Sequence, residues 1–75
     1  MTLADLKKGE KMRVASLKCS DEERNRFISM GLTKGKEITL RNQAPFGDPR
    51  IYTVMGYELT LRNKEAQKIM IEPIA

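Results

Sequence analysis

Large apolar residues alternate with polar ones in several short runs, which glycine- and proline-containing segments separate. The clearest run is 57–62, where every second position carries Tyr57, Leu59 or Leu61. Side chains on a strand point to opposite faces in turn, so this pattern predicts a strand with one buried face. Alternation, or a high content of branched and aromatic residues, predicts further strands over 11–18, 37–42, 50–55 and 69–72. The chain is therefore predicted to be mainly β, a small and strongly bent antiparallel barrel of five short strands.

The run 11–18 changes phase in the middle. Met12 and Val14 fall on one face of a regular strand, whereas Ala15 and Leu17 fall on the other. An extra residue in one strand produces such a change together with a local bend, so we expect a β-bulge near Ala15–Ser16.

One helix is predicted between the first two strands, ending at about Met30. Ser20 has the position of a helix cap whose side chain accepts from the amide of Glu23, and Glu23 can reach back to the amide of Ser20. The only other large apolar residues of this segment are Phe27 and Ile28, so the helix is expected to cover one spot on the sheet.

The helix and the next strand meet at a joint that contains two glycines. Gly31 directly follows the helical pattern, where a helix often ends in a residue of left-handed conformation. Leu32 then has the position whose side chain folds back on the last helical turn, near Phe27. Gly35 lies in a tight turn over 33–36, after which the next strand begins at once. Gly31 and Gly35 are therefore expected to be structural residues.

The two ends of the chain add small elements. Leu3 and Leu6 are spaced like a single helical turn or a short packed extension. Asn63 can cap one late helical turn over 64–67, and Pro73 ends the last strand. The expected core comprises Val14, Phe27, Ile28, Leu32, Ile38, Leu40, Val54, Leu59, Leu61, Ile69 and Ile71.

The segment 43–49 is predicted to be a loop, because its two prolines and one glycine exclude a continuing strand. It is the best candidate for a partner-binding surface, since loops often carry binding residues. Two alternatives stay open for Phe46: its ring is tucked under the barrel, or it is exposed to a partner. Asp48 between glycine and proline is ordinary turn chemistry. The candidate partner-binding residues are Ala44, Pro45, Phe46, Gly47, Asp48, Pro49 and Arg50.

Composition is typical of a small folded domain. The 75 residues allow a single domain, 1–75, with 40% hydrophobic and 32% charged residues. Cys19 is the only cysteine, so no intrachain disulfide forms, which favours a reducing compartment. No run is long and apolar enough for a bilayer, and the N-terminal residues lack the layout of a signal peptide. We expect a cytoplasmic protein.

The net charge of +4 arises from basic residues that are interleaved with acidic ones. This pattern is typical of a solvated surface, and it permits contact with nucleic acid without demanding it. Nucleic-acid binding is the main rival function from another class, yet only Tyr52 and Tyr57 could stack bases from strands. Tyr57 shares a phase with Leu59 and Leu61 and is expected to pack inward.

Residues suited to metal binding and catalysis are scarce. The chain has no histidine, and its only close acids, 21–23, occupy a helix start where they suit the helix dipole. Met12, Met30 and Met55 fall in core-like patterns and are interpreted as packing residues. No cysteine–histidine pair or convergent acid pair supports catalysis. We therefore expect a protein that is not an enzyme, with no metal site and no evident cofactor.

Three segments taken together resemble those of a known family, namely 27–35 (FISMGLTKG), 44–49 (APFGDP) and 56–62 (GYELTLR). With its opening residues 3–10 (LADLKKGE), the chain is similar to the FeoA family, small cytosolic companions of the FeoB ferrous iron transporter. The likeness covers nearly the whole chain in the right order. It implies an SH3-like barrel, which agrees with the strand count.

The resemblance also implies a regulatory role in iron homeostasis, beside a FeoB-type transporter whose cytosolic part is a GTPase. In that setting Arg50 is either an arginine finger that reaches the GTPase site or a solvated residue at a strand start. Iron binding that is weak or completed by the partner stays open by family association only. Two alternatives remain: a metal-repressor-like regulatory domain, because the same domain occurs in such repressors, and a weak homodimer through Phe46.

Overall fold

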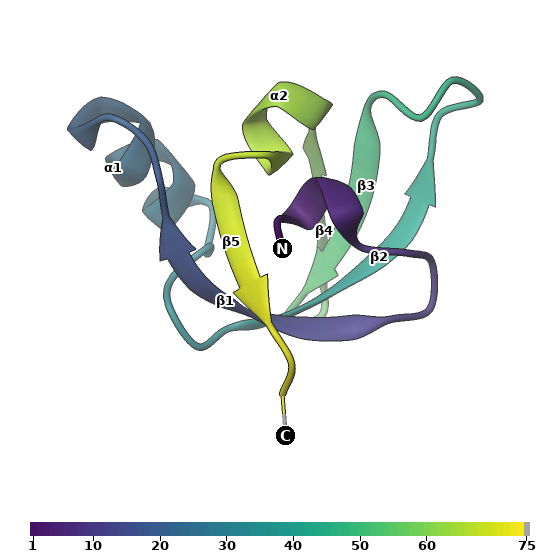
Figure 1. The fold of residues 1–75 in the computed structure, drawn as a ribbon, viewed down its shortest axis with the longest axis horizontal. Helices are drawn as coiled ribbons and strands as arrows, with labels where there is room; N and C mark the ends of the chain where they lie inside the picture. The colour runs from purple at the N-terminus through teal and green to yellow at the C-terminus, as the bar shows by residue number, and fades with distance from the viewer. Residues whose placement is uncertain (75) are drawn as a thin grey trace.

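The computed structural model describes residues 1–74 of the chain. In chain order its elements are η1 (Leu3–Asp5, a turn of 3-10 helix), β1 (Lys11–Leu17), α1 (Asp21–Ser29), β2 (Glu37–Gln43), β3 (Arg50–Val54), β4 (Tyr57–Leu61), α2 (Asn63–Ala66) and β5 (Ile69–Glu72). The strands form one antiparallel sheet in the order β4-β3-β2-β1-β5 (Figure 1). The predicted mainly-β fold of five strands, one inserted helix and a late helical turn is confirmed.

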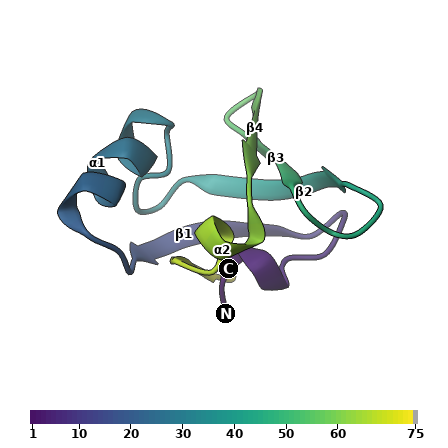
Figure 2. The same cartoon turned by 90° about the horizontal axis from the view of Figure 1, so that it is seen from above.

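The strands β1 and β2 carry very different connections at their two ends. The helix α1 lies at the end where β1 leads into β2, and the β2–β3 loop (44–49) lies at the opposite end (Figure 2). Both views place α1 and this loop on opposite sides of the molecule. Within residues 1–74, no helix has the length and apolar character that crossing a membrane requires.

Two irregularities bend the sheet. The register of β1 against β5 shifts between Val14 and Ser16, which confirms the bulge expected near Ala15–Ser16. A second shift, in β2 against β3 between Leu40 and Asn42, was not predicted. Bulges bend a strand and increase its twist, so these two let the long strands wrap around one core.

The core draws on every helix and strand and on Leu6 and Leu32 from the connecting segments, but on no residue of the β2–β3 loop. Of the predicted core residues only Ile28 is wrong: its side chain is 44% exposed, because neighbouring Phe27 takes the position of α1 that faces the sheet. Met55 is also wrong as a packing residue, since it lies exposed in the tight β3–β4 turn with a φ of 51°. The buried apolar residues are Leu3, Leu6, Val14, Phe27, Leu32, Ile38, Leu40, Tyr52, Val54, Leu59, Leu61, Ala66, Ile69 and Ile71.

The helix α1 begins largely as predicted, while α2 does not. The hydroxyl of Ser20 accepts from the amide of Glu23 at 3.3 Å, which confirms the predicted cap. The predicted cap at Asn63 is wrong: Arg62 is the capping residue, and its amide donates to a carboxylate oxygen of Glu65 at 3.1 Å. A carboxylate three residues on can satisfy the free amide, so no capping side chain is needed at that position.

The α1–β2 joint (30–36) closes the helix as the glycine pattern predicted. Gly31 has a φ of 94°, its amide donates to Ile28 at 2.9 Å, and the amide of Leu32 donates to Phe27 at 3.0 Å. These are the paired hydrogen bonds of a Schellman motif, which satisfy carbonyls at a helix end. Gly35, with a φ of 90°, forms the turn into β2.

Tyr57 takes part in this joint from the far edge of the sheet. Its ring is 44% exposed, so the expectation that it packs inward is wrong. Its hydroxyl instead donates to the carbonyl of Met30 at 2.6 Å, and this oxygen is one that the helix end leaves free. The hydroxyl lies so close to Gly31 that any side chain there would collide with it.

Candidate partner-binding site

The β2–β3 loop has a defined shape that its own backbone maintains. The amide of Ala44 donates to the carbonyl of Pro49 at 3.0 Å, and the amide of Gly47 donates to the carbonyl of Ala44 at 2.7 Å. Gln43 of β2 and Arg50 of β3, which flank the loop, form the neighbouring cross-strand pair. Gly47 has a φ of 82°, which glycine adopts without steric conflict. The loop is therefore a closed turn on a regular hairpin.

Phe46 lies at the outside of this turn with 97% of its surface exposed. Of the two alternatives that the sequence left open, the structure selects the exposed ring. Pro45 beside it is also exposed. An exposed phenyl ring contributes nothing to the core and keeps its full apolar area in water, which is typical of a contact residue.

Arg50, at the base of the loop, is the largest departure from the sequence prediction. Its side chain is 8% exposed, so it is neither a solvated residue nor an arginine finger able to reach a partner's active site. The guanidinium donates to the backbone carbonyls of Ala4, within η1, and of Leu6, directly after it. A planar, five-donor group suits this double role better than any other side chain.

Tyr52 adds a second tie between β3 and η1. Its hydroxyl donates to the carbonyl of Leu3 at 2.7 Å, and the Arg50 guanidinium lies 5.9 Å from the centre of its ring. Burial raises the pKa of Tyr52 to about 12, because the apolar surroundings disfavour the phenolate. Arg50 and Tyr52 therefore clamp the N-terminal turn onto the strand that carries the loop.

Asp48 ties the other side of the loop to α2. One oxygen of its carboxylate accepts from the backbone amide of Asn63 at 3.0 Å. This bond joins residues that are distant in the chain, so the role of Asp48 goes beyond ordinary turn chemistry. The loop is thus held at Asp48 and Arg50, while Phe46, which precedes both, is left free.

Sequence reasoning missed Tyr52 and the burial of Arg50, although one signal was present. Arg50, Tyr52 and Val54 share a phase in β3, and all three are buried. An arginine in phase with core residues at a strand start can be read as a buried anchor. Its acceptors, 44 and 46 residues away, are not visible in any local pattern.

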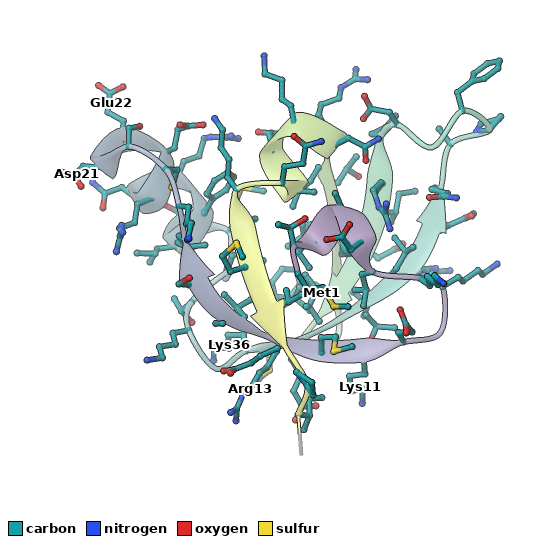
Figure 3. All side chains as sticks on the ribbon, in the orientation of Figure 1. Met1, Lys11, Arg13, Asp21, Glu22 and Lys36 are labelled. Carbon is teal, nitrogen blue, oxygen red and sulfur yellow. The ribbon has the colours of Figure 1, made fainter. Side chains whose placement is uncertain are left out.

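Acidic side chains do not converge anywhere in residues 1–74: no three histidine, cysteine, aspartate or glutamate residues gather there. Asp21 and Glu22 point outward from the start of α1 (Figure 3). Glu23 forms an ion pair with Lys68 of the turn before β5. These acids serve the helix start and the surface. Cys19 is half-buried and packs against the core.

Comparison with known proteins identifies a family model that matches the chain and a protein that is similar to it. A family model described as the FeoA domain matches residues 1–73. The protein of Porphyromonas gingivalis named Fe(2+) transport protein A/Fe(2+) transporter FeoB fusion protein is 35% identical over 75 residues. That match covers 100% of this chain but only 9% of the fusion protein.

Two solved structures share the fold. Iron(II) transport protein A from Clostridium thermocellum superposes with a TM-score of 0.93 at 34% identity, covering 99% of this chain and 46% of that one. FeoA from Stenotrophomonas maltophilia, solved with zinc and described as a prokaryotic SH3 domain protein, gives a TM-score of 0.82 at 26% identity. This second match covers 100% of this chain and 99% of the other. The expected SH3-like fold is confirmed.

Proposed function

The chain belongs to the FeoA family, which is associated with ferrous iron transport, and from this premise we propose that it docks on a FeoB-type transporter and modulates it. The chain docks on the cytosolic, GTPase-containing region of the transporter. The chain acts there as a single domain, 1–75, on the cytoplasmic side of the membrane. The family is one of small accessory domains and not a known family of enzymes.

The fusion in Porphyromonas gingivalis supports this partner. There, a segment similar to the whole chain is part of the same polypeptide as a FeoB transporter. Covalent fusion raises the effective concentration of two modules for each other, so it fits a pair that works together.

The single observation that carries the proposal is the exposure of Phe46. A phenyl ring that is 97% exposed, on a loop closed by the Ala44–Pro49 hydrogen bond and anchored at Asp48, fits the role of a preformed contact residue. Aromatic side chains that fill a pocket on a partner are typical centres of binding energy. Because the loop is already ordered, little conformational entropy is lost when it binds. Residues 44–49 form the contact, and Arg50 holds their base.

Calorimetric titration against the purified cytosolic region of the organism's FeoB tests this proposal. We expect wild type to bind and Phe46→Ala to bind at least about 20-fold more weakly, since a central aromatic contact contributes about 2 kcal/mol or more. Met55→Ala is the matched control, because Met55 is a 68% exposed apolar residue in another tight turn. Equal losses in both variants, or no binding of wild type, would contradict the proposal.

Contact with a second copy of the chain, in a weak homodimer, is the alternative role of Phe46. Light scattering over a range of concentrations distinguishes this role from contact with the transporter. A mass that stays monomeric at the concentrations of the calorimetry assigns Phe46 to the transporter. A mass that rises with concentration in wild type but not in Phe46→Ala assigns it to a second copy of the chain.

A further inference from the structure

A groove of about 450 Å³ lies beside the base of the β2–β3 loop. One wall is the segment that follows η1, with Lys7 and Lys8, and the other is the end of β2, with Asn42 and Gln43. Arg50 also lines the groove. The lining therefore combines three cationic side chains with two amides.

The charge of Arg50 is not neutralised by the fold. The side chain is more than nine-tenths buried, yet its acceptors are the neutral carbonyls of Ala4 and Leu6. No ion pair among residues 1–74 includes Arg50, and its buried Nε has no hydrogen-bond partner within that part of the chain. Asp5, the one carboxylate of the lining, interacts with Arg50 electrostatically but forms no ion pair with it, so part of the field of this buried cation extends into the groove.

Asp5 is the one acid in the lining, and it is already engaged. One oxygen of its carboxylate accepts from the amide of Thr2 at 2.9 Å and from the hydroxyl of Thr2 at 3.3 Å. The amide of Thr2 holds the pKa of Asp5 below its usual value, so the group is charged and committed to the start of η1. It offsets only part of the positive charge, and the groove remains cationic.

The groove is continuous with the proposed contact loop. Gln43 and Arg50, which line the groove, are also the paired residues at the base of the loop that carries Phe46. A ligand in the groove therefore lies at the base of the loop whose tip carries the exposed ring of Phe46. This combination suits a protein segment, which offers carboxylates and an apolar surface together. A nucleic acid is disfavoured, because the basic residues of the chain are interleaved with acidic ones and form no continuous cationic surface along which a phosphate backbone could lie.

We propose that the groove between Lys7–Lys8 and Asn42–Gln43 binds an acidic segment of a protein partner. Carboxylates of the segment pair with the two lysine ammonium groups and accept from the two amides, in the field of the Arg50 guanidinium, which no ion pair neutralises. This inference rests on the proposed function and adds the chemistry of the docking segment. Charge pairs at the rim of an interface set its orientation and association rate, while Phe46 supplies apolar contact.

A short probe tests the groove without the transporter. The full chain, isotope-labelled, is titrated with a blocked tetraglutamate peptide, and amide chemical shifts are followed by NMR. We expect shifts to gather at 5–8, 42–43 and 50, to vanish in about 0.5 M salt, and to be absent with tetraglutamine. Shifts spread over the whole surface would overturn the inference. So would a single-stranded oligothymidylate that binds at these residues more tightly than the peptide.

Two double variants distinguish binding in the groove from general electrostatic attraction to the chain. Lys7→Gln with Lys8→Gln should weaken peptide binding about fivefold, since the two exposed pairs together contribute about 1 kcal/mol. Lys18→Gln with Lys34→Gln removes the same charge at the opposite end of β1 and β2, near α1, and should leave binding unchanged. Equal weakening in the two double variants would overturn the inference. Arg50 is left intact because it holds η1 in place.

The same variants distinguish this inference from the function on which it rests. If the cytosolic region of FeoB binds the Lys7→Gln, Lys8→Gln variant as tightly as wild type, the acidic segment is wrong and the partner stands. If that region does not bind at all while tetraglutamate still occupies the groove, the groove stands and FeoB is not its partner.

Discussion

The two segments that flank β2 contain similar residues, but one buries its apolar side chain and the other exposes it. The α1–β2 joint and the β2–β3 loop each contain a glycine at positive φ, 94° at Gly31 and 82° at Gly47, and each involves an aromatic ring. At the joint, Tyr57 donates to the end of α1 and Leu32 is fully buried. In the loop, Phe46 is 97% exposed although Asp48 and Arg50 tie down its C-terminal side and the amide of Ala44 donates to the carbonyl of Pro49 across its base.

The difference shows how a small domain can divide its apolar residues between folding and contact. At the joint the backbone hydrogen bonds of the helix end direct Leu32 toward the sheet, so it joins the core. In the loop the ties are made by Asp48 and Arg50, which leaves Phe46 without a structural task. Changes at the joint should therefore affect stability, and changes at the tip of the loop should affect binding.

The largest effect is expected from Gly31→Val. A branched residue at this positive φ costs about 1–3 kcal/mol, and a Cβ would lie 1.7 Å from the Tyr57 hydroxyl oxygen, so the total loss should reach about 3 kcal/mol. Gly35→Ala is the matched control, because Gly35 has a similar φ of 90° but no atom within 4 Å of an added Cβ. We expect that control to lose about 1 kcal/mol in urea unfolding. Equal losses in Gly31→Ala and Gly35→Ala would show that Tyr57 does not restrict the joint.

Arg50→Met should lower the free energy of unfolding by about 2 kcal/mol. The carbonyls of Ala4 and Leu6 lose their donors, although removal of a buried charge that forms no ion pair offsets part of this loss. Arg41→Met serves as a control that breaks only the exposed pair with Glu58 and should change stability by less than about 1 kcal/mol. Hydrogen exchange of the amides of Asp5 and Leu6 should accelerate in the Arg50 variant. Unchanged exchange there would mean that η1 is held by other contacts.

Tyr57→Phe tests the contact between Tyr57 and the α1–β2 joint. Loss of the hydrogen bond to Met30 should lower the free energy of unfolding by about 1 kcal/mol. The same change removes the oxygen closest to Gly31, so Gly31→Ala should be less harmful with phenylalanine at position 57 than with tyrosine. Additive effects in this double-mutant cycle would exclude a direct contact between the two residues.

A smaller effect is expected from pH. The Arg26 guanidinium lowers the pKa of Glu65 below its ordinary 4.5, and Lys68 likewise lowers the pKa of Glu23. A lowered folded-state pKa means that the stability from these pairs is present above about pH 4.5 and is lost as the pH falls through the folded-state values. The free energy of unfolding in urea should therefore fall less between pH 6 and pH 3 in Glu65→Gln than in wild type, with a difference of less than about 1 kcal/mol. The same fall in both proteins would show that the pair with Arg26 contributes nothing.

The smallest effect on stability is expected from Phe46→Ala. The free energy of unfolding should stay within about 0.5 kcal/mol of wild type, because the ring packs against nothing that the fold needs. Thermal and urea unfolding check this directly. A loss of more than about 1 kcal/mol would place the ring in the structure and weaken its assignment to a partner.

The strands, the bulge at Ala15–Ser16 and the helix end at Gly31 could be predicted because each depends on residues close in sequence. The burial of Arg50 could not, since its acceptors belong to η1 at the other end of the chain. Ile28 was misassigned because two adjacent apolar residues on a short helix compete for one sheet-facing position. The exposure of Phe46 also had no local signature, since a Pro- and Gly-rich loop can turn its aromatic residue either way.

The most direct test of the division between joint and loop is an amide chemical-shift map of the isotope-labelled chain bound to the unlabelled cytosolic region of FeoB. We expect the largest shifts and line broadening at 43–50 and at 5–8, with 30–36 unaffected. That result would place the contact where Phe46 and the cationic groove lie. Perturbation centred on 30–36 and α1, with 43–50 unchanged, would contradict the proposed contact surface.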